Sequence, residues 1–138
     1  MVEVVDRQRR LIVDHERCRK VAARALKAIG KKDADVTIAF ISDQKMRALN
    51  RSFRGLNKTT DVLSFPSDDK FAGAANLGDI AISVARAEKQ AAENGLSLDG
   101  EIAQLILHGL LHLCGYDHET DNGEMNALEL RLRRRLGI

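Results

Sequence analysis

The sequence is poor in the residues that mark several protein classes. It has no tryptophan, one proline, one tyrosine and four phenylalanines among its 138 residues. So few aromatic side chains argue against a base-stacking platform like that of an RRM domain. The two cysteines, Cys18 and Cys114, form no CxxC pair. We therefore expect no disulfide framework and a reduced, cytoplasmic setting.

Long apolar runs and a leader pattern are also missing. No stretch approaches the roughly 18 residues of a membrane span, because Gln104, His108 and His112 interrupt the most apolar segment. The first residues, MVEVVD, lack the basic region and the apolar run of a signal peptide. These absences predict a protein that has no membrane partner.

A large net charge is absent as well. Lys and Arg number 22 and Asp and Glu number 20, which gives a net charge of +2 and excludes a polycation of the histone type. The charge is unevenly distributed, since residues 1–66 carry 15 basic and 8 acidic side chains, whereas residues 67–138 carry 7 and 12. A basic half indicates an anionic partner, although solvated helix faces explain most such imbalances.

What is present suits one compact domain. The composition is 44% hydrophobic and 30% charged, which is typical of a folded globular chain and argues against disorder. No repeat, linker or low-complexity tract divides the sequence. The length therefore predicts a single domain over residues 1–138.

Hydrophobic periodicity and cap residues predict an α+β domain. We expect strands at residues 2–5, 36–41, 61–65 and 77–83, and a loop at residues 67–76. We expect helices at about residues 13–29, 43–50, 84–92, 99–113 and 121–135. Ser42 or Asp43 is the expected cap of the second helix, and Asp121 with Glu124 is a candidate capping box for the last. Four short strands and about five helices favour a small mixed sheet covered by helices.

The segment that carries chemistry is HGLLHLCGYDH, at residues 108–118. His108 and His112 are one helical turn apart and share a face, so both imidazoles can reach one metal ion. Gly115 permits the left-handed conformation that ends a helix, so the chain can turn back and bring His118 to the same point. Three neutral nitrogens leave a fourth position for water, as in a catalytic zinc site. We expect one zinc ion per chain.

A simpler interpretation is that these histidines are core residues. The helix is apolar almost all round, and a single histidine in such a helix is more often a hydrogen-bonded core residue. However, three of only four histidines fall in the spacing HxxxHxxxxxH, and chance produces both later positions roughly once in a thousand cases. Cys114 lies about 200° round the helix from His112 and is expected to pack away from the metal. Asp117 is either a carboxylate that orients an imidazole or a solvated turn residue.

Three sequence blocks carry a resemblance to a known family. HExxHxxGxxH zincin proteases have a similar spacing, but Gly109 stands where they carry a general-base glutamate. HGLLHLCGYDH instead resembles the HGxLHLxGYDH signature of the YbeY family. Two further blocks are similar to that family's LNxxxRG followed by TDVLSFP, and to its LGDIxIS strand. They are LNRSFRG at residues 49–55 with TDVLSFP at residues 60–66, and LGDIAIS at residues 77–83.

The resemblance implies a zincin-like fold, with a four-stranded mixed sheet and a central metal-bearing helix. It implies a single-strand-specific, zinc-dependent endoribonuclease that acts in rRNA maturation, at the 3′ end of 16S rRNA, and in ribosome quality control. The implied partners are single-stranded RNA and the small ribosomal subunit with its assembly factors, and neither DNA nor a membrane is expected. It implies that the metal ligands are His108, His112 and His118, and that Arg54 and His108 are catalytic. The family often has proline where this chain has Thr59, so we expect a less rigid entry into the following strand.

The chemistry of phosphodiester cleavage fits these residue types. A metal ion can polarise a nonbridging oxygen or lower the pKa of bound water to about 7. A guanidinium is permanently charged and offers a planar fork to phosphate. Arg54 is expected in a loop between a helix and a strand. Asp61 and Asp79 are weak candidates for positioning water, since capping and strand-end roles are more common.

Two alternatives to the endoribonuclease remain open. A zincin-like metallopeptidase is disfavoured by Gly109. A non-catalytic ribosome assembly factor would hold a structural zinc and bind rRNA through the basic half. An open fourth coordination position favours an enzyme, because structural zinc sites usually have four protein ligands.

Overall fold

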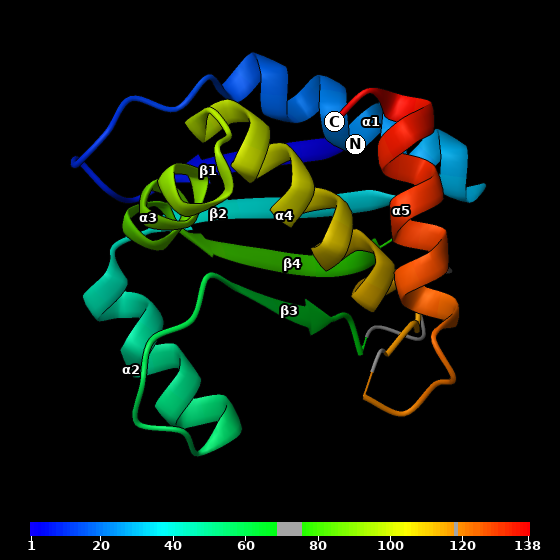
Figure 1. Ribbon diagram of the computed structural model, residues 1–138. Helices are drawn as coiled ribbons and strands as arrows, with labels where there is room; N and C mark the ends of the chain where they lie inside the picture. Colours follow the sequence, from blue (N-terminus) through cyan, green and yellow to red (C-terminus); the bar gives the residue numbers. More distant parts are fainter. Residues whose placement is uncertain (69–75, 118) are drawn as a thin grey trace.

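The computed structural model describes residues 1–68, 76–117 and 119–138. Within these residues the chain forms four strands and five helices (Figure 1). The strands are β1 (Val2–Asp6), β2 (Asp35–Ile41), β3 (Val62–Pro66) and β4 (Asn76–Ser83). The helices are α1 (His15–Ile29), α2 (Asp43–Arg54), α3 (Val84–Asn94), α4 (Leu98–Leu113) and α5 (Glu124–Leu136). The predicted α+β class is confirmed, while the zincin likeness stays a prediction.

The strands form one mixed sheet in the order β1-β2-β4-β3. β1, β2 and β4 are parallel, whereas β3 is antiparallel to β4 and forms an edge of the sheet. Ser64 of β3 is paired with Ile80 of β4. The outer edge of β3 therefore faces away from the sheet, below α4 in the view of Figure 1.

The two faces of the sheet carry two separate apolar clusters. On one face, Ile80 and Ile82 of β4 join the main core with residues of α1, α3, α4 and α5. On the other face, Ala81 belongs to a small second cluster under α2, whose buried members are Ile41, Met46, Leu63 and Ala81. This division follows from the alternation of side chains along a strand. It places α2 and α4 on opposite faces of the sheet.

The end of α2 and the start of α5 differ from the sequence-based expectation. α2 continues one turn beyond Asn50 to Arg54 and ends where Gly55 adopts a left-handed φ of 69°. α5 begins at Glu124 rather than Asp121, because Gly123 is left-handed at φ 99° and interrupts the helix. The Asp121 carboxylate accepts the backbone N–H groups of Gly123 and Met125, at 2.8 and 2.9 Å. Asp121 thus caps from outside the helix, and the predicted start of α5 at this residue is wrong.

The predicted loop at residues 67–76 is described only at its ends. Ser67 donates its backbone N–H to the carbonyl of Leu77 at 3.0 Å, and Asn76 already belongs to β4. Residues 69–75 lie outside the described residues. No helix in the described part of the chain is both long and apolar enough to cross a bilayer.

Candidate active site

A cleft of about 370 Å³ opens along the outer edge of β3. Its walls come from the end of α2, the loop before β3, β3 itself, the end of α4 and the turn after it. The lining residues are Arg54, Thr60, Asp61, Val62, Leu63, Ser64, His108, His112, Asp117 and Glu119. The cleft therefore brings together Arg54, His108 and His112, three of the four residues that the sequence analysis assigns to the site.

His108 and His112 converge as their helical spacing predicts. Their Nε2 atoms lie 3.2 Å apart, and their ring planes meet at 75°. Two nitrogens bound tetrahedrally to one zinc ion, each at about 2.0–2.1 Å, lie about 3.3 Å apart. The observed separation fits the pair to a shared ion.

Glu129 of α5 fixes the orientation of the His108 ring. The Glu129 carboxylate accepts hydrogen bonds from Nδ1 of His108 and, at 2.7 Å, from Nη2 of Arg133. Burial alone raises the pKa of Glu129, but the contacts with His108 and Arg133 outweigh burial and lower this pKa below its usual value. An ionised carboxylate can only accept, so Nδ1 carries the proton and a neutral ring keeps its lone pair on Nε2. Metal-binding histidines are commonly held by such a carboxylate.

The turn after α4 begins at Gly115, which has the left-handed conformation that the sequence predicts. Gly115 is left-handed at φ 96°, and its N–H bonds the carbonyl of His112 at 3.0 Å. The predicted ligand His118 lies outside the described residues. Its neighbours Asp117 and Glu119 both line the cleft. The Asp117 carboxylate accepts the N–H of Glu119 at 3.0 Å, so it organises this turn.

Arg54 is the last residue of α2 and not, as predicted from the sequence, part of a loop. The carbonyl end of a helix carries partial negative charge, which favours a guanidinium there. Arg54 lines the cleft, and within the described ranges it forms no ion pair. Its charge is therefore available to a ligand in the cleft.

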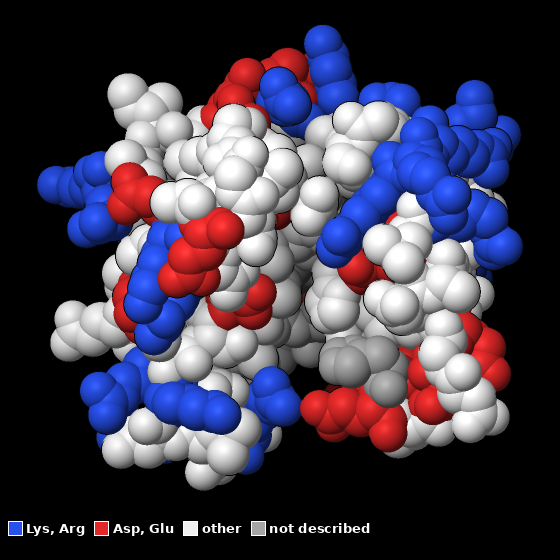
Figure 2. All heavy atoms as spheres, in the orientation of Figure 1, with Lys and Arg blue, Asp and Glu red and all other residues white. Residues whose placement is uncertain are grey.

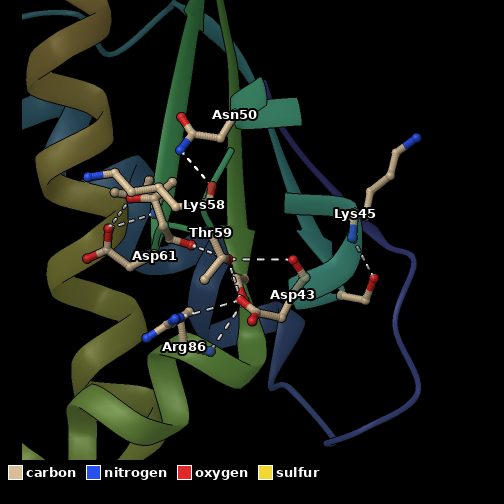
Figure 3. Close-up of polar contacts among 11 residues, drawn as sticks. Asp43, Lys45, Asn50, Lys58, Thr59, Asp61 and Arg86 are labelled. Carbon is tan, nitrogen blue, oxygen red and sulfur yellow. Dashed lines mark hydrogen bonds and ion pairs between the residues drawn. The ribbon is translucent and has the colours of Figure 1, made fainter. Parts of the chain in front are cut away.

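The loop before β3 is tied to α2 by polar contacts (Figure 3). The Thr59 hydroxyl donates to the Asp43 carboxylate, which also accepts from the Ser83 hydroxyl at 3.0 Å. Asn50, fully buried in α2, donates its side-chain N–H to the carbonyl of Lys58 at 2.8 Å. A hydroxyl contact thus tethers the loop where the family often has proline.

The two weak aspartate candidates lie in different places. Asp61 lines the cleft, and its carboxylate accepts the N–H of Val62 at 2.8 Å, which is a capping role. Asp79 precedes Ile80 on β4, and Ile80 faces the main core, so Asp79 lies on the opposite face of the sheet. Asp79 is not among the residues that line the cleft.

Gly109 is explained by close packing. A Cβ atom at this position would lie 2.9 Å from Cγ2 of Ile80 on β4. α4 therefore approaches the sheet closely enough that a larger side chain has no room. Ser64 adds a second link, because its hydroxyl donates to the Gly109 carbonyl at 3.2 Å. Gly109 stands where zincin proteases carry their general-base glutamate, and Ile80 of β4 occupies the space that such a side chain would need.

Cys114 is not among the residues that line the cleft. Burial raises the pKa of its thiol, and the charge of Lys31, which follows α1, partly opposes this rise. Cys114 thus lies outside the cleft that His108 and His112 line.

Sequence reasoning missed Glu129 and Arg133. The available signal was an acidic residue among the apolar positions of the last helix, where Met125 and Leu132 are buried. Glu129 itself is 7% exposed. A carboxylate at such a position needs a buried partner, but the sequence does not say that this partner is His108.

Comparisons with known proteins give the family of this chain. The family model described as Endoribonuclease YbeY matches residues 3–137. Endoribonuclease YbeY of Aquifex aeolicus (strain VF5) is 44% identical over 112 residues, which are 81% of this chain and 75% of that protein. Endoribonuclease YbeY of Koribacter versatilis (strain Ellin345) is 50% identical over 115 residues, or 83% of this chain and 72% of that protein.

The fold is similar to the solution structure of TM1509 from Thermotoga maritima. The TM-score is 0.66 at 24% sequence identity, over 99% of this chain and 89% of that one. This likeness concerns the fold alone. From its sequence matches, the chain belongs to the YbeY endoribonuclease family.

Proposed function

We propose that this chain is a zinc-dependent endoribonuclease that cuts single-stranded RNA. The observation that carries the proposal is the placement of the His108 and His112 Nε2 atoms, 3.2 Å apart, in one cleft with Arg54. The family assignment supports RNA as the substrate. His118 is the proposed third ligand, from the sequence motif.

Each residue of the cleft has a role that its chemistry supports. Arg54 binds the scissile phosphate and opposes the negative charge that develops on its nonbridging oxygens. Glu129 holds His108 so that Nε2 faces the cleft. A bound zinc ion supplies a Lewis acid that stabilises the same developing charge.

The biological role that we propose follows the family resemblance. The substrate is rRNA, with processing at the 3′ end of 16S rRNA and a part in ribosome quality control. The proposed partners are the small ribosomal subunit and its assembly factors, and the proposed location is the cytoplasm.

The test combines metal analysis with single-turnover cleavage of a single-stranded RNA, with and without a chelator. We expect about one zinc per chain and loss of cleavage on chelation.

Arg54→Ala should lower the rate by on the order of 10²–10³ and leave zinc content and folding unchanged. RNA affinity should fall much less, because other basic residues supply phosphate contacts. Arg54→Lys tests whether charge alone suffices. Arg24→Ala, on an exposed part of α1, is the matched control.

The alternatives give different results. A protein that binds RNA and zinc but cuts nothing is the assembly factor with a structural zinc. Cleavage of a peptide in place of RNA would identify a metallopeptidase. Equal falls in cleavage and binding for Arg54→Ala would make Arg54 a docking residue.

A further inference from the structure

Phe53 is an exposed aromatic residue in the last turn of α2. Its exposed fraction is 67%, whereas Phe40 in the main core is 0% exposed. Its ring packs edge-to-face on Phe65 of β3, with centroids 5.0 Å apart and planes at 68°. Phe65 in turn packs against the small cluster under α2. This contact holds Phe53 in place while most of its surface faces solvent.

The pair of Phe53 and Phe65 borders the candidate active site. Phe53 directly precedes Arg54 and Phe65 directly follows Ser64, and both of these neighbours line the cleft. Phe53 and Phe65 are therefore chain neighbours of two residues that line the cleft. On β3 the Phe65 ring lies on the α2 face of the sheet, whereas Ser64 faces α4. An RNA with one phosphate at Arg54 would lie against the last turn of α2, which also carries Phe53.

The surface around Phe53 is basic. α2 and the loop that follows it carry Lys45, Arg47, Arg51, Arg54 and Lys58. Within the described residues none of these five forms an ion pair, and Asp43, the one acidic residue of α2, contacts Arg86 at 3.6 Å. Figure 2 shows Lys and Arg atoms gathered over α2 at the lower left, and acidic atoms across the hollow from them. The acidic residues that line the cleft after α4 are Asp117 and Glu119.

This charge pattern favours a nucleic acid over an apolar protein as the partner of the surface around Phe53. A polyanion is attracted to the α2 side of the cleft and repelled from the opposite side. An exposed aromatic ring inside a basic surface is the combination that binds single-stranded nucleic acid, because phosphates meet the cations and bases stack on the ring. An apolar protein partner would not require the unpaired cations.

We propose that Phe53, supported by Phe65, stacks on an RNA base adjacent to the phosphate that Arg54 binds. The inference rests on the proposed function and adds a subsite to it. A base in a duplex is stacked on both faces, whereas an unpaired base presents a face to an aromatic side chain. The subsite therefore gives a physical reason for a preference for single strands.

The experiment measures binding and cleavage separately. A short labelled single-stranded RNA is titrated at fixed salt with wild type, Phe53→Ala, Phe53→Trp and the control Ile12→Ala, whose residue is 97% exposed in the β1–α1 loop. The titration is repeated with RNAs in which one base at a time is replaced by an abasic site. Single-turnover cleavage of the intact RNA gives the half-saturating enzyme concentration and the maximal rate.

We expect Phe53→Ala to weaken binding by on the order of 10- to 100-fold, the range for one base–aromatic contact. Its half-saturating concentration should rise while its maximal rate changes little, and Phe53→Trp should restore both. One abasic position should weaken wild type and leave Phe53→Ala unaffected. Thermal melting should show all variants folded.

Three outcomes would overturn the subsite. They are unchanged binding in Phe53→Ala, an equal response of both proteins to every abasic position, or a loss that Phe53→Trp does not restore. Failure of the proposed function looks different, because wild type then cuts no RNA whatever residue stands at position 53. An abasic position that weakens only wild type would support the subsite even in that case.

Discussion

At the scale of single residues, the most informative side chain lies outside the histidine motif. Glu129 lies 21 positions after His108, yet its carboxylate bonds the His108 ring. Asp117, which lies within the motif, lines the cleft and organises its own turn. The orientation of His108 therefore depends on the packing of α5 against α4, which no local pattern reports.

We expect Glu129→Ala to weaken zinc binding about 10- to 100-fold, as the loss of such supporting contacts typically does. The physical reason is that His108 loses the group that keeps its Nε2 lone pair facing the cleft. Glu129→Gln retains an acceptor and should lose less. Competition with a chromogenic chelator measures the affinity, and nitrogen NMR shifts report the tautomer of His108.

Two further variants serve as controls for the zinc affinity of Glu129→Ala, one expected to lose zinc and one expected to keep it. His112→Ala removes a predicted ligand and should lose most of the zinc together with the stability that zinc binding contributes. Cys114→Ala should keep zinc and activity at a packing cost of about 1 kcal/mol. Zinc affinity in Glu129→Ala equal to that of Cys114→Ala would refute the role of Glu129. Loss of zinc from Cys114→Ala would indicate a closed structural site.

At the scale of elements, local signals located the strands and most of the helices. β-branched runs and Pro66 bounded β2 and β3 well, because these features act within a few residues. The start of α5 was wrong because Gly123 adopts a left-handed conformation that its residue type permits but does not require. α2 runs one turn beyond its predicted end at Asn50 and stops only at the left-handed Gly55. The cleft was less predictable, since it needs α2, β3 and α4 to meet in space.

Gly109 makes an element-scale prediction about how α4 packs on β4. Gly109→Ala should destabilise the protein by about 1–2 kcal/mol, because a crowded methyl group costs about 1–3 kcal/mol and better helix propensity returns up to about 1 kcal/mol. Urea unfolding of the zinc-loaded protein measures the change. Gly100→Ala, in the first turn of the same helix, is the control, since its Cβ would meet only Ser97 Oγ at 3.2 Å and Leu96 Cβ at 3.9 Å. A more stable Gly109→Ala protein would show that Ile80 gives way.

At the scale of the whole molecule, the fold converts a charge imbalance along the sequence into one across the cleft. The basic half supplies α2 on one side, and the acidic half supplies the turn after α4 on the other (Figure 2). Under the proposed function, a phosphate backbone would run along α2 and past Arg54, toward the histidines. The sequence indicates an anionic partner, but only the fold brings the basic residues of α2 to one side of the cleft.

Within the described part of the chain, the apolar cluster under α2 has four buried residues, far fewer than the main core on the other face of the sheet. The two sides of the cleft should therefore differ in local stability. Arg54 and Phe53 lie on a helix with two buried residues, Met46 and Asn50, whereas the histidines lie on a helix with ten. Segments with few buried contacts open first in native proteins. Amide hydrogen exchange should therefore be faster in α2 than in α4, and on warming the arginine side of the cleft should detach before the histidine side does. Equal protection of both helices would mean that the two clusters unfold as one cooperative unit.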